Sequence, residues 1–261
     1  MIGFLLRKTF YDLWDNMFKI VVLNLGFIAC TAIPIFLPAL ASRFIDSIAL
    51  NVVLVALGIL VCSVYLSAAS FSIRVISDYG TFTFGDFIKS FKFAWPAGLF
   101  MGGFVFIVFM IVTVVLPFYL TMEPPLAGLA LAAIIFWTMI FAILAFQYYF
   151  TVYARLSSNI VKAIRKCLLI SLDNTGLSIF LVFNNIIALI ISTLLAFMFP
   201  GPIGVLLYLD QALRLRLLKY DYLEANPEAN RRQIPWDALL IEERDKTGTR
   251  SFRNFIFPWK D

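Results

Sequence analysis

The residue with the most unusual chemical setting is Asp210, which lies inside an otherwise apolar segment. Arg214 follows four residues later, so a helix would place the acid and the base on one face. Removing a charge from water is costly, and an ionisable side chain inside a membrane segment is therefore a candidate functional group. Two interpretations stay open: a structural ion pair near a thinned membrane edge, or a site for a substrate or a proton.

Amide side chains inside the apolar segments form the second group of interest: Asn24, Asn51, Gln147, Asn184 and Asn185. Hydrogen bonds of such groups between membrane helices contribute about 0.6 kcal/mol on average, so packing is their main predicted role. Asn184 and Asn185 stand out because adjacent residues of a helix point to different faces. One amide could line a cavity while its neighbour holds the helices together. We therefore take Asp210, Arg214, Asn184 and Asn185 as the candidate intramembrane polar site.

Groups for catalysis are scarce in this chain. It has no histidine, which removes histidine acid–base catalysis, most nucleophile–histidine pairs and the commonest zinc ligand sets. It also lacks the P-loop, the G-x-S-x-G elbow and the H-E-x-x-H motif. We expect no catalytic residue, no metal and no cofactor, and we expect that the chain is not an enzyme. An intramembrane enzyme acting on lipid could use a serine, but none has an evident base partner: Ser63, Ser67, Ser70 and Ser192.

The three cysteines are far apart in the sequence. Cys30 and Cys62 fall inside predicted membrane spans, and Cys167 falls in a basic segment. This spacing does not resemble a disulfide framework, and each is predicted to be a small buried apolar residue.

The composition indicates which elements must position these residues. Hydrophobic residues make up 62% of the 261 positions and charged residues 14%, whereas soluble domains have about 45–50% and about 25%. Several almost uncharged runs exceed the roughly 20 residues that a helix needs to cross a bilayer. Because these runs are continuous rather than alternating, they predict helices and not the strands of a barrel. The predicted fold class is an all-α polytopic membrane protein.

Six transmembrane helices are predicted, at about residues 20–40, 48–70, 96–120, 126–150, 177–199 and 203–218. The six spans form three consecutive pairs. One amphipathic segment precedes each pair, at residues 1–17, 84–95 and 153–174. The predicted architecture is therefore three helical hairpins, each preceded by an amphipathic interfacial helix. Ala39-Leu40-Ala41 resembles a signal-peptide cleavage site, but the apolar stretch is too long for one, and we expect the first span to be retained. The predicted domains are an N-terminal helix (1–19), a six-span membrane domain (20–218) and a C-terminal tail (219–261).

A G-x-x-x-G motif, Gly98 to Gly102, lies at the start of the third predicted span. Small residues at this spacing let two helix backbones approach closely. The motif predicts helix packing, and it supports oligomerisation only weakly. The sequence does not predict an oligomeric state.

The distribution of lysine and arginine predicts the orientation in the membrane. With the N-terminus in the cytoplasm, Arg43 is the one basic residue in an external loop, and the other 20 of the 21 lie on the cytoplasmic side. Basic residues near membrane spans favour the cytoplasmic side. This bias also supports the short sixth span, which returns the basic tail to the cytoplasm. Both termini are predicted to be cytoplasmic.

The C-terminal tail combines a predicted helix over residues 237–246, ended by Gly248, with a basic and aromatic segment. That segment is the candidate partner-binding tail: Arg250, Phe252, Arg253, Phe255, Phe257 and Trp259. It could dock on a membrane protein or on anionic headgroups, or it could pack back on the protein's own cytoplasmic helices. Glu242, Glu243 and Asp245 in the same tail argue against nucleic-acid binding.

Four short sequences support a resemblance to a known family: Leu13-Trp14-Asp15-Asn16, Asn24-Leu25, the Pro34–Pro38 end of the first span, and the Arg-Leu-Arg-Leu-Leu run at 214–218. Over residues 5–222 the chain resembles the YesL-like family (DUF624) of bacterial integral membrane proteins. The proline–glycine-rich end of that family's first span has no clear match here. The resemblance implies a protein of the bacterial inner membrane that is associated with carbohydrate uptake systems. It carries over no functional residue.

The sequence leaves two main functional hypotheses. The leading one is a non-enzymatic accessory or scaffold subunit of a membrane complex, such as a carbohydrate transporter. Its partners would be the lipid bilayer and a membrane protein, which it would contact through the tail and the cytoplasmic interfacial helices. The alternative is a small transporter or channel with a polar site near the sixth span.

Overall fold

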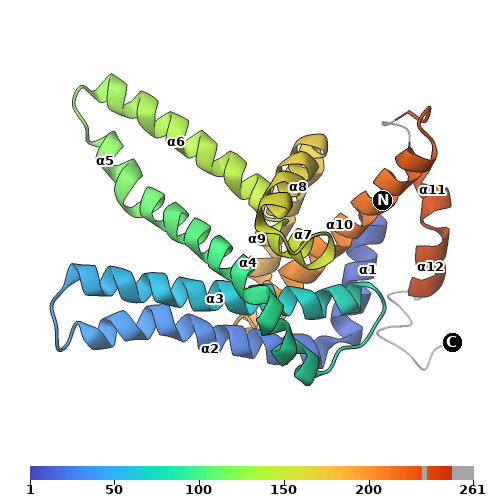
Figure 1. The fold of residues 1–261 in the computed structure, drawn as a ribbon, viewed down its shortest axis with the longest axis horizontal. Helices are drawn as coiled ribbons and strands as arrows, with labels where there is room; N and C mark the ends of the chain where they lie inside the picture. Colours follow the sequence, from blue (N-terminus) through green and yellow to red (C-terminus); the bar gives the residue numbers. More distant parts are fainter. Residues whose placement is uncertain (231–233, 249–261) are drawn as a thin grey trace.

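The computed structural model describes residues 1–230 and 234–248, and these residues form helices joined by short turns (Figure 1). The helices are α1 (Ile2–Asp15), α2 (Met17–Ala41), α3 (Ile48–Ser77), α4 (Phe84–Met110), the π-helical η1 (Ile111–Val115), α5 (Leu116–Leu120), α6 (Pro125–Phe146), α7 (Tyr149–Arg155), α8 (Ile160–Asp173), α9 (Thr175–Leu194), α10 (Gly201–Ala225), α11 (Trp236–Leu239) and α12 (Ile241–Thr247). The predicted all-α class is confirmed for the described part of the chain.

Among the described residues, five helical segments are long and apolar enough to cross a membrane: Met17–Ala41, Ile48–Ser77, Phe84–Leu120, Pro125–Arg155 and Thr175–Leu194. No more than 22% of the most apolar stretch of any of them is buried inside the protein. Apolar surface on this scale would be unstable in water, and lipid is the solvent that accepts it. The chain is therefore a helical membrane protein. The predicted sixth span, residues 203–218, is not among the five.

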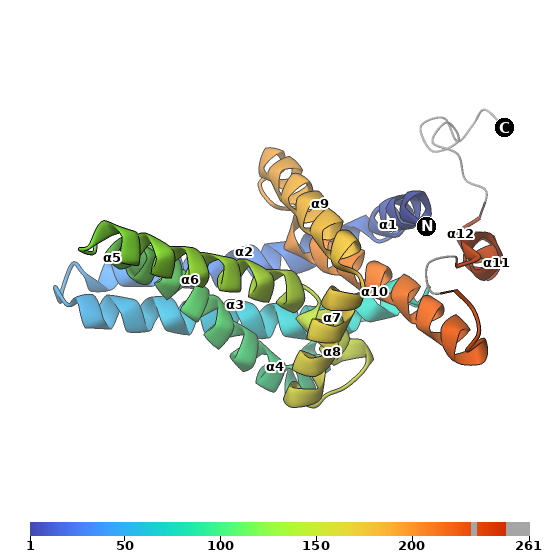
Figure 2. The same cartoon turned by 90° about the horizontal axis from the view of Figure 1, so that it is seen from above.

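The helices form two long arms that share one polar end. The α2–α3 turn and the α5–α6 turn lie at one end of the long axis, and the two arms diverge toward it in Figure 1. The N-terminus, α11 and α12 lie at the opposite end, and α8 and α9 lie nearer the middle of the long axis (Figures 1 and 2). At about 1.5 Å per residue, the 30 residues of α3 extend roughly 45 Å, so α3 is longer than the apolar core of a bilayer.

Helix α10 is enclosed by protein, which explains why its composition differs from that of a lipid-facing span. Every residue from 206 to 213 is buried, although a helix of eight residues presents side chains in all directions. It contacts α1, α2, α3, α7 and α9. A helix that touches protein on all sides can carry Asp210 and Gln211, because neighbouring polar groups satisfy them.

The start of α10 is capped by a side chain from α2. Nδ2 of Asn24 donates hydrogen bonds to the carbonyl oxygens of Met198 (3.0 Å) and Pro200 (2.8 Å). Its Oδ1 accepts a hydrogen bond from the backbone N–H of Ile203 at 3.1 Å. The amide thus satisfies one of the free N–H groups at the helix start, a task that usually falls to the N-cap residue. The chain can approach Asn24 this closely because Gly201 has no Cβ and adopts a φ of +62°.

The predicted interfacial helix at residues 84–95 is not a separate element. It forms the first part of α4, which continues from Phe84 to Met110 with Pro96 inside it. The start of α4 is fixed by a capping box, in which Thr83 and Asp86 exchange hydrogen bonds. Pro96 removes one backbone hydrogen bond but does not end the helix, so residues 84–95 and the start of the third predicted span form one continuous helix.

The glycines of the G-x-x-x-G motif face α3 within the same chain. A Cβ added at Gly98 would collide with the backbone of Val64. One added at Gly102 would lie 2.8 Å from Cδ2 of Leu60. Gly103, the next residue, has no atom within 4 Å of the same position. The predicted role in helix packing is confirmed, and the contact is between α3 and α4.

Candidate functional site

Asp210 lies at the centre of a buried ionic network, and its partner is Arg155 rather than Arg214. The side chain of Asp210 is 1% exposed. Arg155, the last residue of α7, donates from Nη2 to Oδ2 of Asp210 at 2.5 Å and from Nε to Oδ1 at 3.2 Å. Both carboxylate oxygens therefore bind one guanidinium, which is the strongest geometry available to a carboxylate in protein.

Asp78 connects Asp210 to Arg214. It follows the C-terminal residue of α3, and its Oδ1 lies 2.9 Å from Nη1 of Arg155 and 3.2 Å from Nη1 of Arg214. The two predicted site residues on α10 are thus linked indirectly, through Arg155 of α7 and Asp78 at the end of α3. The four-residue spacing places both side chains on one face of α10. Asp210 pairs with Arg155, however, whereas Arg214 pairs with Asp78 and Glu243.

Arg214 also holds the C-terminal helix α12 against the bundle. Its Nη2 donates to Oε1 of Glu243 at 2.7 Å, and Nη1 donates to the carbonyl oxygen of Ser77. The side chain of Glu243 is only 7% exposed. Its other oxygen, Oε2, accepts a hydrogen bond from the hydroxyl of Tyr79 at 2.9 Å. Burial raises the pKa of Tyr79 well above its ordinary value, so the hydroxyl stays protonated as a donor.

Helix α1 presents polar side chains to the same network. Lys8 is 2% exposed; its Nζ lies 2.6 Å from Oδ2 of Asp12 and 3.9 Å from the ring centre of Tyr79. Gln211 of α10 donates to Asp12 and accepts a hydrogen bond from Thr9, each at 2.5 Å. Burial lowers the pKa of Lys8 and raises that of Asp12, and their mutual attraction opposes both shifts.

Helix α1 therefore docks on the protein through a mixed face, in which Lys8 and Thr9 are buried beside Leu5 and Tyr11. Leu6 and Trp14 are left exposed, at 43% and 45%. An amphipathic helix at the membrane surface is expected to turn its apolar side to the lipid. The outward side carries these apolar residues together with the exposed Arg7 and Asp15, and the inward side contacts α10.

We call the connected charged residues the ionic layer: Lys8, Asp12, Arg74, Asp78, Arg155, Asp210, Arg214 and Glu243. Four acids balance four bases, so the layer carries no net charge. Removing one partner of a buried ion pair leaves an uncompensated charge, which costs about 3–5 kcal/mol. The layer joins α1, α3, α7, α10 and α12 by contacts that depend on position and charge.

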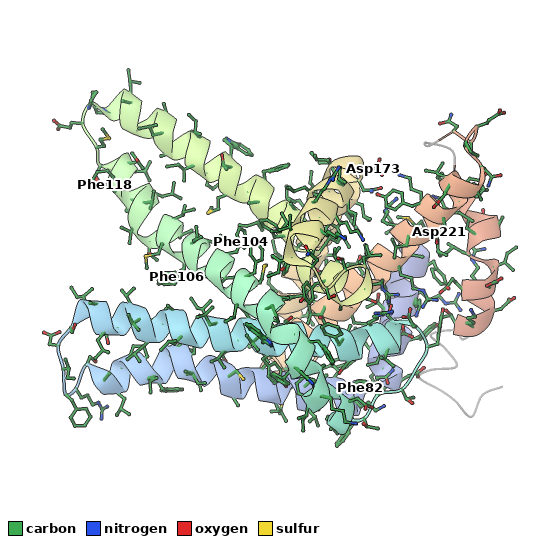
Figure 3. All side chains as sticks on the ribbon, in the orientation of Figure 1. Phe82, Phe104, Phe106, Phe118, Asp173 and Asp221 are labelled. Atoms are coloured by element: carbon green, nitrogen blue, oxygen red, sulfur yellow. The ribbon has the colours of Figure 1, made fainter. Side chains whose placement is uncertain are left out.

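A second, smaller polar cluster joins α8 to the end of α10. Nζ of Lys219 lies 3.0 Å from Oδ2 of Asp173, which also accepts a hydrogen bond from the hydroxyl of Tyr220 at 3.0 Å. Partial burial opposes ionisation of Asp173, but the hydrogen bonds from Lys219, Tyr220 and Asn174 outweigh it and lower the pKa of the carboxyl. Figure 3 shows Asp173 far from Phe118, which lies near the tip of the α4–α5 arm.

The structure does not bring Asn184 and Asn185 into the ionic layer. Both lie on α9, where Asn185 is buried and Asn184 is half-buried. Oδ1 of Asn185 has no hydrogen-bond partner. Among the other amides, Gln147 donates to the carbonyl oxygen of Ser178 and so links α6 to α9. The predicted partner-binding residues Arg250, Phe252, Arg253, Phe255, Phe257 and Trp259 lie outside the described residues.

The sequence analysis missed the partners in the ionic layer: Asp78, Arg155, Glu243, Tyr79 and Lys8. A signal for some of them existed, because Asp78 and Arg155 follow long apolar stretches at ends predicted to face the cytoplasm. Glu243 could not be found in this way, since it is one of several acids in a polar tail. Its contact with Arg214 depends on the packing of α12 against α10, which no local sequence pattern predicts.

The geometry supports a structural role for these groups. In the described residues no cluster of three or more metal-binding side chains is present, and all three cysteines are free. The carboxylates of Asp210 and Glu243 have both oxygens bonded to basic or hydroxyl groups. Comparison of the chain with protein-family models, curated proteins and solved structures finds no match.

Proposed function

We propose that this chain is a non-enzymatic accessory or scaffold subunit of a membrane complex in the bacterial inner membrane. The observation that carries the proposal is the buried pair between Arg214 and Glu243, which fixes α12 to the end of the bundle. A carbohydrate uptake transporter is the partner that the family resemblance implies. The chain would act by presenting a fixed cytoplasmic surface to that partner.

The contacts of α12 support this role, because so short a helix is not stable alone. Helices below about 12 residues are marginal in water and need tertiary packing, and α12 has seven residues. Leu240, just before it, is fully buried, and Glu243 joins it to α10. The docked helix ends at Gly248, whose φ of +76° is a conformation that glycine adopts without strain.

We further propose that α10 is the sixth crossing and that both ends of the chain are cytoplasmic. An even number of crossings agrees with α1 and α12 lying side by side, since Phe4 and Arg7 line one hollow with Arg244 and Gly248. The lysine and arginine distribution assigns that side to the cytoplasm. Burial of α10 by its neighbours supports its place at membrane depth despite its charges.

The alternative, a small transporter or channel, receives less support from the geometry. Such a site needs polar groups that can exchange a protein partner for a substrate. Asp210 instead binds Arg155 with both oxygens and has no exposed surface. The alternative requires Asp210→Asn to abolish flux of a substrate while expression survives.

Co-purification of partners from native membranes in mild detergent tests the proposal. The full chain is compared with a chain ending at Gly248, which keeps α12 and the ionic layer, and with Glu243→Gln. The matched control is Glu242→Gln, because the side chain of Glu242 is 88% exposed and belongs to the same helix. Each sample is analysed by mass spectrometry at equal amounts of the monodisperse protein.

We expect a stoichiometric membrane partner with the full chain and with Glu242→Gln. The chain ending at Gly248 should lose the partner, and Glu243→Gln should retain less of it because α12 is no longer fixed. Full retention by the chain ending at Gly248 contradicts a role for the tail. The absence of a stoichiometric partner of the full chain contradicts the accessory function.

A further inference from the structure

Helix α8 lies across the end of a membrane span. The span Pro125–Arg155 consists of α6 and α7, and only residues 156–159 separate it from α8. Figure 2 shows α6 along the long axis of the molecule and α8 across it. A helix that crosses the end of a membrane span lies parallel to the membrane surface, at the depth of the lipid headgroups.

The outward side of α8 carries exposed apolar residues. Val161, Leu169 and Leu172 are 73%, 56% and 59% exposed. Together with Arg165 they recur at spacings of four, four and three residues, which places them on one face of the helix. One exposed apolar side chain is ordinary, but three on one short face are typical of a surface that lipid or another molecule covers.

Basic side chains lie among these apolar residues. Lys162 and Arg165 are exposed, and in the part of the chain that the structure describes neither side chain forms a hydrogen bond or an ion pair. Lys166 donates one hydrogen bond to the carbonyl oxygen of Leu156 at 3.2 Å, which leaves two of its three donors. Long basic side chains can cover apolar surface with their stems while their charged ends reach the headgroups.

No acid of α8 balances these charges. The helix contains one acidic residue, Asp173, which already binds Nζ of Lys219 at 3.0 Å and the hydroxyl of Tyr220 at 3.0 Å. Lys162, Arg165 and Lys166 therefore give α8 an excess of positive charge.

The neighbouring helices supply no free acid either. Helix α8 contacts α4, α6, α7 and α9, and α6 and α9 contain no charged residue. The charged residue of α7 is Arg155, which is itself basic. On α4, Oδ1 of Asp86 lies 3.9 Å from Nζ of Lys89, and Lys92 adds one more positive charge. The surface around α8 is therefore positive as a whole.

We propose that the outward face of α8 binds the headgroups of anionic phospholipids in the membrane leaflet at this end of the protein. The lipid phosphates accept hydrogen bonds from Lys162 and Arg165, and Val161, Leu169 and Leu172 contact the glycerol and the first acyl carbons. Lipid fits this face better than a soluble anion, because it matches both the charge and the apolar residues. The site is independent of the accessory function, since α8 makes none of the contacts that fix α12.

Native mass spectrometry of the purified full chain tests the site. Phosphatidylglycerol and phosphatidylcholine with identical acyl chains are titrated separately, and the affinity for each lipid is measured. The test variant is Lys162→Gln/Arg165→Gln. The matched control is Lys162→Arg/Arg165→Lys, which keeps both positive charges at the same two positions. Both variants should fold, because the two side chains are exposed and form no bond within the described residues.

We expect the unmodified chain and the control to bind phosphatidylglycerol in preference to phosphatidylcholine. Loss of the two charges should lower the phosphatidylglycerol affinity roughly 25-fold, about fivefold for each charge, and leave the phosphatidylcholine affinity unchanged. Raising the ionic strength should reduce the preference of the unmodified chain, because exposed charges are screened by salt.

Four results overturn the proposal. The first is equal affinity of the unmodified chain for the two lipids, and the second is unchanged phosphatidylglycerol affinity in Lys162→Gln/Arg165→Gln. The third is complete displacement of phosphatidylglycerol by a small excess of glycerol 3-phosphate, which would show that the ligand is a soluble phosphate ester. The fourth is loss of a co-purified membrane protein from the test variant while its phosphatidylglycerol affinity is retained, which would make α8 a protein contact.

Discussion

The carboxylate of Asp210 and the guanidinium of Arg155 form two hydrogen bonds in a place that water does not reach. Such a pair contributes little net stability when it replaces an apolar contact, but it is costly to break. Its value lies in specificity: α7 and α10 fit together in one position, because a shifted position leaves a charge without its partner. The other buried members of the ionic layer act in the same way.

Asp210→Ala should therefore destabilise the protein much more than its charge alone suggests. The expected loss is about 3–5 kcal/mol of unfolding free energy, because Arg155 keeps only its contact with Asp78. Unfolding in detergent, followed by circular dichroism, measures the change. Asp221→Ala on the exposed side of the same helix is the control and should lose less than about 0.5 kcal/mol. Equal losses in the two variants would contradict the buried pair.

The contact of Asp173 with Lys219 predicts a pH dependence whose sign follows from the lowered pKa. The folded state favours the ionised carboxyl, so its stabilising contribution is complete above the ordinary pKa of 3.8. It is lost as the pH falls through the lower pKa of the folded protein. Asp173→Asn should thus lower the melting temperature at pH 7, and the difference from the unmodified chain should shrink below about pH 4. A difference that stays constant from pH 7 to pH 3 contradicts this contact.

At the scale of the helix, close packing between α3 and α4 depends on two glycines. Gly98→Ala should destabilise the protein by roughly 1–3 kcal/mol, because the added methyl group meets the backbone of Val64 and neither helix can move freely. Gly103→Ala is a matched test on the same helix, since the position is open. It should be neutral or slightly stabilising, as alanine favours helix over glycine. Thermal unfolding of both variants in one detergent measures the difference, and similar effects would contradict the packing.

Most helices could be predicted from the sequence because lipid imposes a simple rule. A helix that faces hydrocarbon must be apolar along its whole length, and α2, α3, α6 and α9 obey this closely. The predicted separate interfacial helix at residues 84–95 was wrong, because α4 continues through Pro96 and a long helix tolerates one missing backbone hydrogen bond. Whether α10 crosses the membrane could not be decided from its composition. Its neighbours are protein and not lipid, so it need not be apolar along its whole length.

The candidate site was less predictable, because ion pairs between helices depend on the fold. From the sequence, Arg214 was the base expected to pair with Asp210, since i,i+3 and i,i+4 neighbours are the contacts that a single helix fixes. The actual partner, Arg155, lies 55 residues away. Glu243 and Lys8 join the same layer from the two ends of the described chain, and no local pattern links them.

The whole molecule has an apolar part and a polar part. The arms of α2–α3 and α4–α6 carry exposed apolar side chains such as Ile35, Phe118 and Leu126, which are 63%, 63% and 83% exposed. Helices α1 and α12, which contribute Lys8, Asp12 and Glu243 to the ionic layer, lie at the other end (Figures 1 and 2). This division predicts that the bilayer covers the apolar arms and leaves the end with α1 and α12 outside the hydrocarbon.

The account depends most on the claim that the arm tips and the ionic layer lie on opposite sides of the membrane. Labelling with a membrane-impermeant maleimide in intact cells tests it, after Cys30, Cys62 and Cys167 are replaced by serine. Single cysteines are placed by Asp46→Cys, Glu123→Cys and Glu228→Cys, all at exposed positions. We predict that Asp46→Cys and Glu123→Cys are labelled in intact cells and that Glu228→Cys is labelled only after permeabilisation. Labelling of Glu228→Cys in intact cells, or protection of either arm tip, would contradict the account.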